Sequence, residues 1–268
     1  MPTLLLALPL LLQAPEPERL SVVLDPAASV TLEAAWAPCR RSKYGLFART
    51  EVLRTPAPAE ARRTYPAAEL APFLPPGPVA LGEVWPVPRE AILPFLRQLH
   101  ASARAELEYG EPGTFACLRA VGPRRIELLF RAHAEFWLTP EVLYRPAQFE
   151  GRLLLDRERG TPLSLSIVLP DRDTNVDVNV RPKGGAGGAA DIGHVPELAL
   201  VSPAPPGLAP PWEHELTDAD ARRRLARAFY PLARLEWLPF EEALTRASAS
   251  ERSVLVIVLF GTLDDESC

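Results

Sequence analysis

The chain has 268 residues, of which 47% are hydrophobic and 24% are charged, and its formal net charge is -5 at pH 7. These values are typical of a globular protein with enough material for one large domain or two ordinary ones. Lys and Arg are scattered among acidic residues, so the chain offers no basic surface, and we exclude nucleic acid as a partner.

The amino end carries a short apolar run, Leu4–Leu12, followed by Gln13, Ala14 and a stretch rich in Pro and Glu. This order matches the apolar core and small-residue cleavage point of a secretory signal, although a basic flank is missing. The alternative is a hydrophobic first strand or helix of the mature protein. We predict a signal peptide over residues 1–14 and an exported location, periplasmic or extracellular, or the endoplasmic reticulum.

Residues 15–112 are predicted to form a Pro-rich region with one helix. The chain has 31 prolines, about twice the usual share, and many fall before residue 100. Short strand-like runs occur at Leu20–Leu24 and Val30–Ala35. A helix beginning near Pro94 is indicated by apolar residues at helical spacing, namely Ile92, Phe95, Leu96 and Leu99.

From residue 113 the period of apolar residues changes to two, which predicts strands. The alternating apolar set is Ile126, Leu128, Phe130, Ala132, Ala134 and Phe136. A hairpin is expected around Asp156–Gly160, with Leu163, Leu165, Ile167 and Leu169 facing inward, and Val176, Val178 and Val180 indicate a further strand. We therefore predict an antiparallel β-rich domain over residues 113–205.

The opposite face of the first strand carries Arg131, His133 and Glu135, which we expect to form part of a mostly polar row. Such a row could serve as a proton relay or a docking surface. The simpler alternative is a stripe of satisfied ion pairs.

The carboxyl part, residues 212–268, is predicted to begin with two helices. Thr217 is a suitable N-cap for a helix with Ala221, Leu225, Ala228 and Phe229 on one face, which ends at Pro231. A second helix over 239–249 has the apolar face Phe240, Ala243, Leu244 and Ala247, with Glu242 paired to Arg246.

The apolar run Val254–Phe260 predicts a strand buried on both faces, and Cys268 follows it in a loop. A buried strand that delivers a Cys to the loop beyond it is typical of a thioredoxin-like domain. The fold class predicted is therefore α+β: an antiparallel β-rich domain, then helices and the truncated first half of a thioredoxin-like α/β domain.

Other motifs are weak or missing. Cys39, Cys117 and Cys268 are widely spaced, and the chain has no CxxC pair, zinc-knuckle spacing, Gly-x-Ser-x-Gly or His-Glu-x-x-His. The acidic and amide residues of 171–179 alternate like calcium ligands, but Val176 replaces the required Gly and Pro182 the final Glu, so a polar strand face explains them better. Gly184–Gly188 is expected to be a flexible connector.

Several stretches resemble the selenoprotein N family, in the family's order. The two in the carboxyl part are Phe229–Leu244 and Val258–Cys268. The earlier ones are Arg131–Phe136, Pro146–Gly151, Asn175–Asp177 and Asp191–Leu198. Together they span roughly residues 125 to 268.

The resemblance implies that a selenocysteine follows Cys268, and that the thioredoxin-like domain continues beyond it. Because selenocysteine is encoded by UGA, which gene-calling treats as a stop, the resemblance also implies a truncated translation. The full protein would then be a thiol-disulfide oxidoreductase with a Cys-Sec pair, in which Cys268 is the resolving partner. The family's role implies redox and calcium homeostasis, and a redox protein or disulfide as substrate.

Other interpretations remain open from the sequence. The protein could be a non-enzymatic secreted binding module that uses the face of Arg131, His133 and Glu135. In a homodimer, two Cys268 residues and two selenocysteines could also hold an iron-sulfur cluster. No other cofactor or metal site is expected. The sequence leaves membrane association open, and we expect little dithiol chemistry from the 268-residue form alone.

Overall fold

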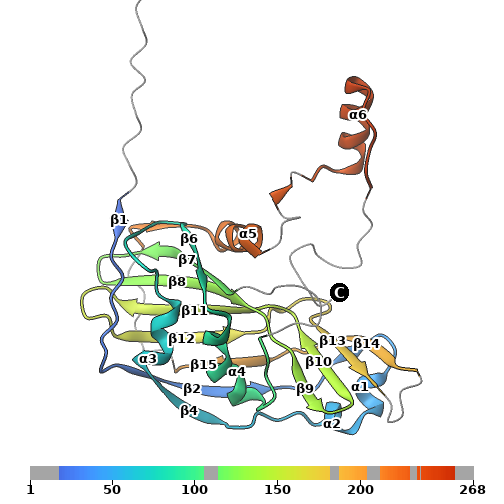
Figure 1. Ribbon diagram of the computed structural model, residues 1–268, viewed down its shortest axis with the longest axis horizontal. Helices are drawn as coiled ribbons and strands as arrows, with labels where there is room; N and C mark the ends of the chain where they lie inside the picture. Colours follow the sequence, from blue (N-terminus) through green and yellow to red (C-terminus); the bar gives the residue numbers. More distant parts are fainter. Residues whose placement is uncertain are drawn as a thin grey trace, which may run out of the picture.

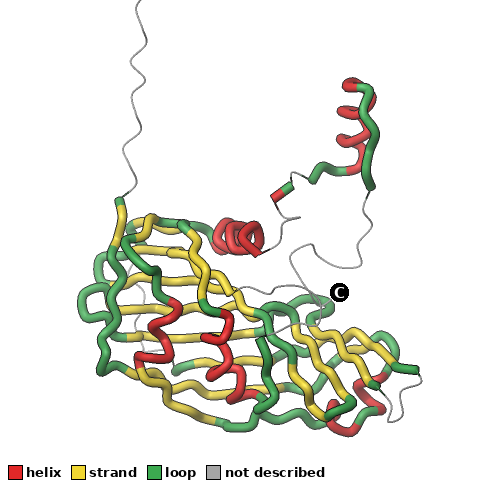
Figure 2. The backbone as a smooth tube through the Cα atoms, viewed as in Figure 1, coloured by secondary structure: helices red, strands yellow, loops and turns green. Residues whose placement is uncertain are grey.

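The computed structural model of the protein describes residues 18–105, 114–181, 187–203, 212–229, 234–235 and 237–256. The predicted signal peptide, residues 184–186 of the predicted connector, and Cys268 lie outside these ranges. Two antiparallel sheets form the framework, and short helices lie against them (Figures 1 and 2).

Within the described residues the larger sheet has nine strands, in the order β16-β7-β8-β11-β12-β15-β2-β4 with β6 also paired to β7. Its strands are β2 Ser29–Trp36, β4 Arg62–Pro66, β6 Val84–Val87, β7 Thr114–Val121, β8 Arg125–Ala132, β11 Phe149–Asp156, β12 Pro162–Val168, β15 Leu198–Val201 and β16 His214–Glu215. Strands from before and after residue 113, where the β-rich segment was predicted to begin, share this sheet. β2 pairs with β15 and with β4, and β6 pairs with β7.

The smaller sheet has five strands among the described residues, in the order β3-β14-β13-β10-β9. Its strands are β3 Arg41–Ser42, β9 Phe136–Thr139, β10 Val142–Pro146, β13 Val176–Val180 and β14 Ala189–His194. A separate pair joins β1 Arg19–Leu20 to β5 Val79–Ala80. The predicted strand over Leu20–Leu24 is therefore limited to its first residue, whereas the one over Val30–Ala35 is confirmed as part of β2.

Most predicted strands of the β-rich segment are confirmed. β11 and β12 form the expected hairpin, in which the carboxylate of Asp156 accepts hydrogen bonds from the amides of Glu158 and Arg159 at 3.0 and 2.7 Å. Gly160 completes the turn with a φ of 68°, a conformation that glycine adopts without strain. In β13, Val176 and Val178 are fully buried. The period-two pattern was a sufficient signal for these strands because one face of each meets the core.

The short helices of the first hundred residues surround the core. They are α1 Leu46–Arg49, α2 Glu51–Arg54, α3 Ala67–Leu70, α4 Leu93–Leu99 and the 3-10 turns η1 Ala71–Phe73 and η2 Arg89–Ile92. The predicted helix near Pro94 is confirmed as α4, and Phe95, Leu96 and Leu99 are fully buried. These side chains pack with Leu128 and Phe130 of β8 in the main hydrophobic core.

The opposite face of the large sheet is covered by α5, Asp218–Phe229, as Figure 1 shows. Ala221 and Leu225 of α5 pack against Cys117 and Leu129 in a second hydrophobic cluster. Thr217 caps the helix as predicted, since its hydroxyl accepts a hydrogen bond from the amide of Asp220 at 3.1 Å. Both faces of the sheet are therefore covered where α5 lies.

The second carboxyl helix, α6 Phe240–Ser250, begins after Pro239 as predicted, and Glu242 pairs with Arg246 at 2.7 Å. Its predicted apolar face is nevertheless unburied, because Phe240 is 54% and Leu244 40% exposed. Of the predicted strand Val254–Phe260, the residues up to Val256 are irregular, and the rest lie outside the described residues. A sheet that would bury this strand is absent from the described part of the chain, so the thioredoxin-like portion stays a prediction.

A close contact in the large sheet offers a test of the packing. Gly151 lies opposite Phe130 in the β8–β11 pair, and a methyl group at Gly151 would lie 1.9 Å from a carbon atom of the Phe130 ring. We predict that Gly151→Ala lowers the free energy of unfolding by about 1–3 kcal/mol, as overpacking does. Urea denaturation measures the change. Gly77→Ala is the control, because the new methyl group there would meet no atom within 4 Å. Equal unfolding midpoints for the two variants would contradict the packing described.

Candidate functional site

Between β8 and β15 the chain crosses from one sheet to the other four times. The crossing segments are residues 133–135, 147–148, 169–175 and 195–197, and we call them together the seam. Three of the crossings lie within stretches that resemble selenoprotein N, and the segment 169–175 shares Asn175 with a fourth such stretch. These four stretches therefore lie where the chain leaves one sheet and enters the other.

Buried hydrogen bonds link the four crossings in series. The ring Nε2 of His133 lies 3.0 Å from the carbonyl oxygen of Pro146, and the amide of Ala147 donates to the carbonyl of Asn175 at 2.8 Å. The side chain of Asn175 then donates to the carbonyl of Val195 at 2.9 Å and accepts from its amide at 2.8 Å. Asn175 is fully buried, so its polar groups cannot bond to water. The hydrogen bonds to Val195 take the place of those lost bonds to water.

The polar row predicted at Arg131, His133 and Glu135 is buried. The exposed fractions are 6%, 3% and 4%, and β8 ends at Ala132, so the strand alternation does not extend to the other two residues. Glu135 accepts a hydrogen bond from Arg145 at 2.8 Å within the seam, which agrees with the alternative of satisfied ion pairs. Because the three side chains are buried, they do not form the exposed docking surface that was the other alternative.

An ion-pair network fastens α5 to the large sheet. Arg152 of β11 donates to Glu150 at 2.9 Å and to Asp218 at 2.7 Å, and Arg222 of α5 donates back to Glu150 at 2.5 Å. Burial favours the neutral form of Glu150, but the hydrogen bonds from Arg222 and the charge of Arg152 outweigh it and lower the pKa of this carboxyl group. The hydrogen bonds from Arg152 likewise lower the pKa of Asp218.

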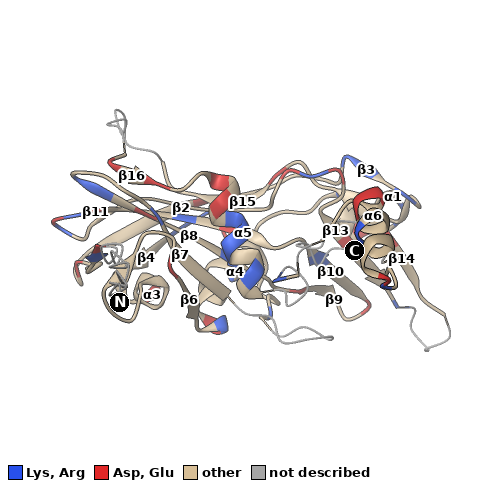
Figure 3. Ribbon diagram, turned by 90° about the horizontal axis from the view of Figure 1, so that it is seen from above, with Lys and Arg blue, Asp and Glu red and all other residues tan. Residues whose placement is uncertain are grey.

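A second arginine holds the segment that leads into α5. Arg119 of β7, with 7% of its side chain exposed, donates to Glu215 at 3.1 Å and to the carbonyl of Leu216 at 3.0 Å, and it also pairs with Glu127. Figure 3 shows basic and acidic residues gathered along α5 above the sheet. Polar contacts thus flank the small apolar cluster under this helix.

A cleft of about 460 Å³ opens at the seam beside this network. Its lining comes from β8, from the two crossings that flank β11 and β12, and from α5. The lining residues are Arg131, Gln148, Glu150, Val168, Leu169, Pro170, Asp171, Arg172 and Arg222. Residues from two of the family-like stretches, Arg131–Phe136 and Pro146–Gly151, meet around this open volume, so we take it as the candidate binding site of this part of the chain.

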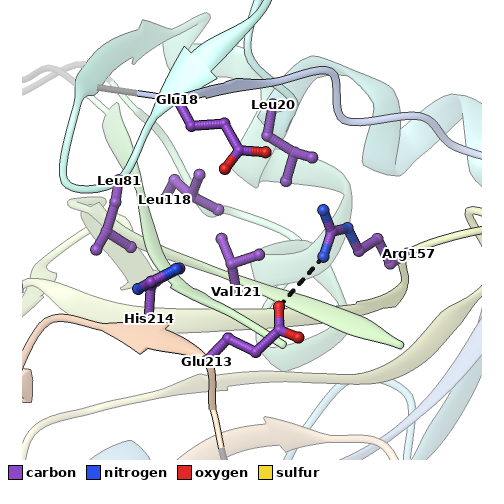
Figure 4. Close-up of a pocket in the computed structure, with 8 residues that line it drawn as sticks. All are labelled: Glu18, Leu20, Leu81, Leu118, Val121, Arg157, Glu213 and His214. Atoms are coloured by element: carbon purple, nitrogen blue, oxygen red, sulfur yellow. Dashed lines mark ion pairs between the residues drawn. The ribbon is translucent and has the colours of Figure 1, made fainter. Parts of the chain in front are cut away.

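A second hollow of about 390 Å³ lies at the other end of the large sheet, where β1, β7 and β16 meet (Figure 4). Leu20, Leu81, Leu118 and Val121 supply apolar side chains to it. At its rim Arg157 and Glu213 form an ion pair at 3.5 Å, marked by the dashed line in Figure 4. The residues that line this hollow include no cysteine. The charges of Arg157 and Glu213 compensate each other.

The two described cysteines are not activated for nucleophilic chemistry. Burial raises the pKa of Cys117 to about 12, and the thiol lies beneath α5 with no exposed surface. Burial also raises the pKa of Cys39, whose thiol donates to the carbonyl of Arg41 at 2.9 Å. A thiolate is the reactive form, so neither residue is suited to disulfide exchange at neutral pH.

The calcium-like alternation at 171–179 does not form a metal site among the residues the structure describes. Asn175 points into the seam, whereas 87% of the Asp171 and 98% of the Asp173 side chain is exposed. More generally, the described ranges contain no group of three or more His, Cys, Asp or Glu side chains placed to hold a metal ion.

Three curated proteins named selenoprotein N are similar to the chain. The one from Danio rerio is 29% identical over 270 residues, which cover 79% of this chain and 48% of that protein. The one from Homo sapiens is 27% identical over 312 residues, covering 91% and 53%, and the one from Mus musculus is 29% identical over 261 residues, covering 76% and 47%. These similarities support a relationship to the selenoprotein N family. The chain spans about half the length of these curated relatives.

No protein-family model and no solved structure matches the chain. Among the described residues, the helices are all too short or too polar to cross a membrane. The predicted reactive residue of the family, Cys268, lies outside the described ranges, so what the structure provides is the framework that precedes it.

The ion-pair network leads to a prediction about neighbouring arginines of α5. Arg222 pairs with Glu150, whose side chain is 12% exposed, while Arg223 pairs with Asp220 where both side chains are exposed. We expect Arg222→Ala to lower the free energy of unfolding at pH 7 by about 1–2 kcal/mol, a value reduced because Arg222 is itself half-exposed. Arg223→Ala should change it by less than about 0.5 kcal/mol.

The pH dependence of this effect has a defined sign. Because the pKa of Glu150 is lowered by folding, its contribution is present above the unfolded pKa and is lost as the pH falls through the folded pKa. The deficit of Arg222→Ala should therefore shrink between about pH 5 and pH 3 in urea denaturation. A deficit that stays constant over this range, or one equal to that of Arg223→Ala, would show that the pair does not stabilise the fold.

Proposed function

We propose that this protein is a thiol-disulfide oxidoreductase of the selenoprotein N type, in which Cys268 and a selenocysteine after it form the redox pair. The observation that supports this proposal most is the similarity to selenoprotein N together with the sequence of one stretch, Val258–Cys268. This stretch resembles the segment that precedes selenocysteine in the family. The relatives' printed name, selenoprotein N, agrees with a selenocysteine-based chemistry.

A Cys-Sec pair suits the reduction of a disulfide. The selenolate is ionised at neutral pH and attacks one sulfur of the substrate disulfide, which releases the other sulfur as a thiolate. The thiolate of Cys268 then attacks the selenium of the mixed selenenyl sulfide and releases the second substrate sulfur. The substrate disulfide gains two electrons, and the protein is left with a sulfur–selenium bond between Cys268 and selenocysteine. An external dithiol restores the reduced pair.

The described cysteines fit a framework role in this proposal. Cys117 is fully buried and Cys39 half-buried, and the pKa of each thiol is raised, so neither competes with the selenocysteine for a substrate disulfide or with Cys268 for the mixed intermediate. The substrate class is a disulfide of a redox or client protein, and the predicted signal at residues 1–14 favours an exported compartment or the endoplasmic reticulum. Disulfides persist in such compartments.

The proposal is tested with two thiol variants in the same protein. The codon that follows Cys268 in the gene is read, and the protein is produced with selenocysteine, or with cysteine in its place, at that position. We expect Cys268→Ser to lower the turnover of a model disulfide at least about tenfold, because the mixed intermediate can no longer be resolved. Cys39→Ser should leave turnover within about twofold, because the pKa of that thiol is raised and the group is held by Arg41.

Two results would contradict the proposal. One is a UAA or UAG codon after Cys268 with no coherent reading frame beyond it. The other is full turnover by Cys268→Ser, which would place the chemistry elsewhere in the protein.

A further inference from the structure

The second hollow, where β1, β7 and β16 meet, has an apolar floor (Figure 4). In a regular strand, residues three apart point to opposite faces. The register of β7 against β8 shifts between Leu118 and Ala120, and this bulge lets both Leu118 and Val121 line the hollow. Leu20 and Leu81 complete the apolar surface. The volume of about 390 Å³ lies within the roughly 300–1,000 Å³ of known ligand pockets, near the lower end.

Backbone hydrogen bonds fix the walls of the hollow. The amide of Gly82 donates to the carbonyl of Leu118 at 2.8 Å, which holds the neighbouring Leu81 next to β7. On the side of β16, the amide of Glu213 donates to the carbonyl of Val121 at 2.9 Å. β1 is anchored by its pairing with β5. A small ligand therefore meets a surface that is already formed, and its binding costs little ordering of the chain.

The carboxylate of Glu18 stands at the rim of the hollow without a protein partner. Side chains alternate along an extended chain, so Glu18 and Leu20 share one face, whereas Arg19 points the other way and pairs with Glu83 at 2.8 Å. Within the described ranges, the exposed side chain of Glu18 forms no hydrogen bond or ion pair. Figure 4 shows it reaching over the apolar floor from β1.

The charges at the rim favour a ligand with one positive charge. Arg157 pairs with Glu213 at 3.5 Å and donates to the carbonyl of Gly122 at 3.0 Å, so its charge is compensated. With histidine counted as neutral, the charge of Glu18 remains in excess among the lining residues. The lining has no Phe, Tyr or Trp, the side chains that bind quaternary ammonium groups. A primary ammonium group suits Glu18 better, because its N–H groups donate charge-assisted hydrogen bonds to a carboxylate.

From this arrangement we infer that the second hollow binds a primary ammonium group carried on a short alkyl chain. The ammonium group donates to Glu18 at the rim, and the alkyl chain packs on Leu118 and Val121. Two sources share this chemistry: a free alkylamine and the side chain of a lysine in a peptide. The inference uses described residues alone and does not depend on the redox role proposed for Cys268.

The inference is tested by NMR titration of the full chain with matched probes. Pentylamine represents a free amine, and N-acetyl-L-lysine methylamide represents a peptide lysine. We expect saturable shifts of the amide signals of Leu81, Leu118 and Glu213 with at least one of them. Tighter binding of pentylamine indicates a free amine as the ligand, tighter binding of the lysine compound indicates a peptide, and equal binding indicates that the ammonium group and its chain are all that is recognised. Each of these results supports the inference.

Two further probes separate the contributions of charge and alkyl chain. Pentan-1-ol has the shape of pentylamine without its charge, and we expect it to bind at least about fivefold more weakly, because a hydroxyl group makes no charge-assisted bond to Glu18. Methylamine keeps the charge without the chain. It should bind at least about tenfold more weakly than pentylamine, because it buries almost no apolar surface on the floor of the hollow.

A pair of variants locates the site. Glu18 is exposed and unpaired within the described ranges, so Glu18→Gln should keep the fold. We expect this variant to bind pentylamine about fivefold more weakly and pentan-1-ol as the wild type does. Glu33→Gln is the matched control, because Glu33 is also an exposed strand residue, and β8, β11, β12 and β15 separate its strand β2 from β7. It should bind pentylamine with wild-type affinity.

Four outcomes would overturn the inference. They are no saturable shift with either amine, equal affinities for pentylamine and pentan-1-ol, wild-type affinity for pentylamine in Glu18→Gln, and an equal loss in Glu33→Gln. Methylamine that binds as tightly as pentylamine would also overturn it, because the apolar floor would then take no part in binding.

Discussion

The buried side-chain amide of Asn175 is the interaction on which the arrangement of the two sheets depends. It satisfies both backbone groups of Val195 in the next crossing, while the carbonyl of the same residue holds Ala147. A buried amide that donates and accepts in this way tolerates few replacements, since each lost partner leaves a polar group without water. Of the stretches that resemble selenoprotein N, the four before residue 200 overlap these crossings, and the framework gives them a structural role.

The carboxyl part is attached to this framework through α5. Arg152 of the sheet donates to Asp218 of the helix, and Arg222 of the helix donates to Glu150 of the sheet. Leu225 packs in the apolar cluster between α5 and the sheet. The same helix contributes Arg222 to the cleft at the seam. The cleft therefore lies between α5 and two of the crossings, next to the ion pairs that fasten this helix to the sheet.

The sequence predicted the local secondary structure well, but it predicted poorly which side chains are buried by segments distant in the chain. The strands β8 and β13, the β11–β12 hairpin, α4 and the Thr217 cap follow from periodicity and capping, which are local properties, whereas β9 and β10 were not predicted. The burial of Arg131, His133 and Glu135 could not be predicted, because it is produced by crossings and by a helix distant in the chain. The cleft was missed for the same reason, although the family-like stretches that form it were a signal that these segments belong together.

Hydrogen exchange in Asn175→Leu tests most directly the claim that the four crossings form one cooperative unit. We expect the amides of Glu135, Ala147 and Val195 to exchange at least about tenfold faster together. The amides of Ala147 and Val195 both bond to Asn175, and Glu135, whose amide bonds to Arg104, lies in the crossing that His133 joins to Pro146. Asn179→Leu is the matched control, since the side chain of Asn179 bonds only to Asp177 in its own strand. If Val195 alone lost protection while Glu135 and Ala147 kept their wild-type rates, the crossings would be independent and the account would be contradicted.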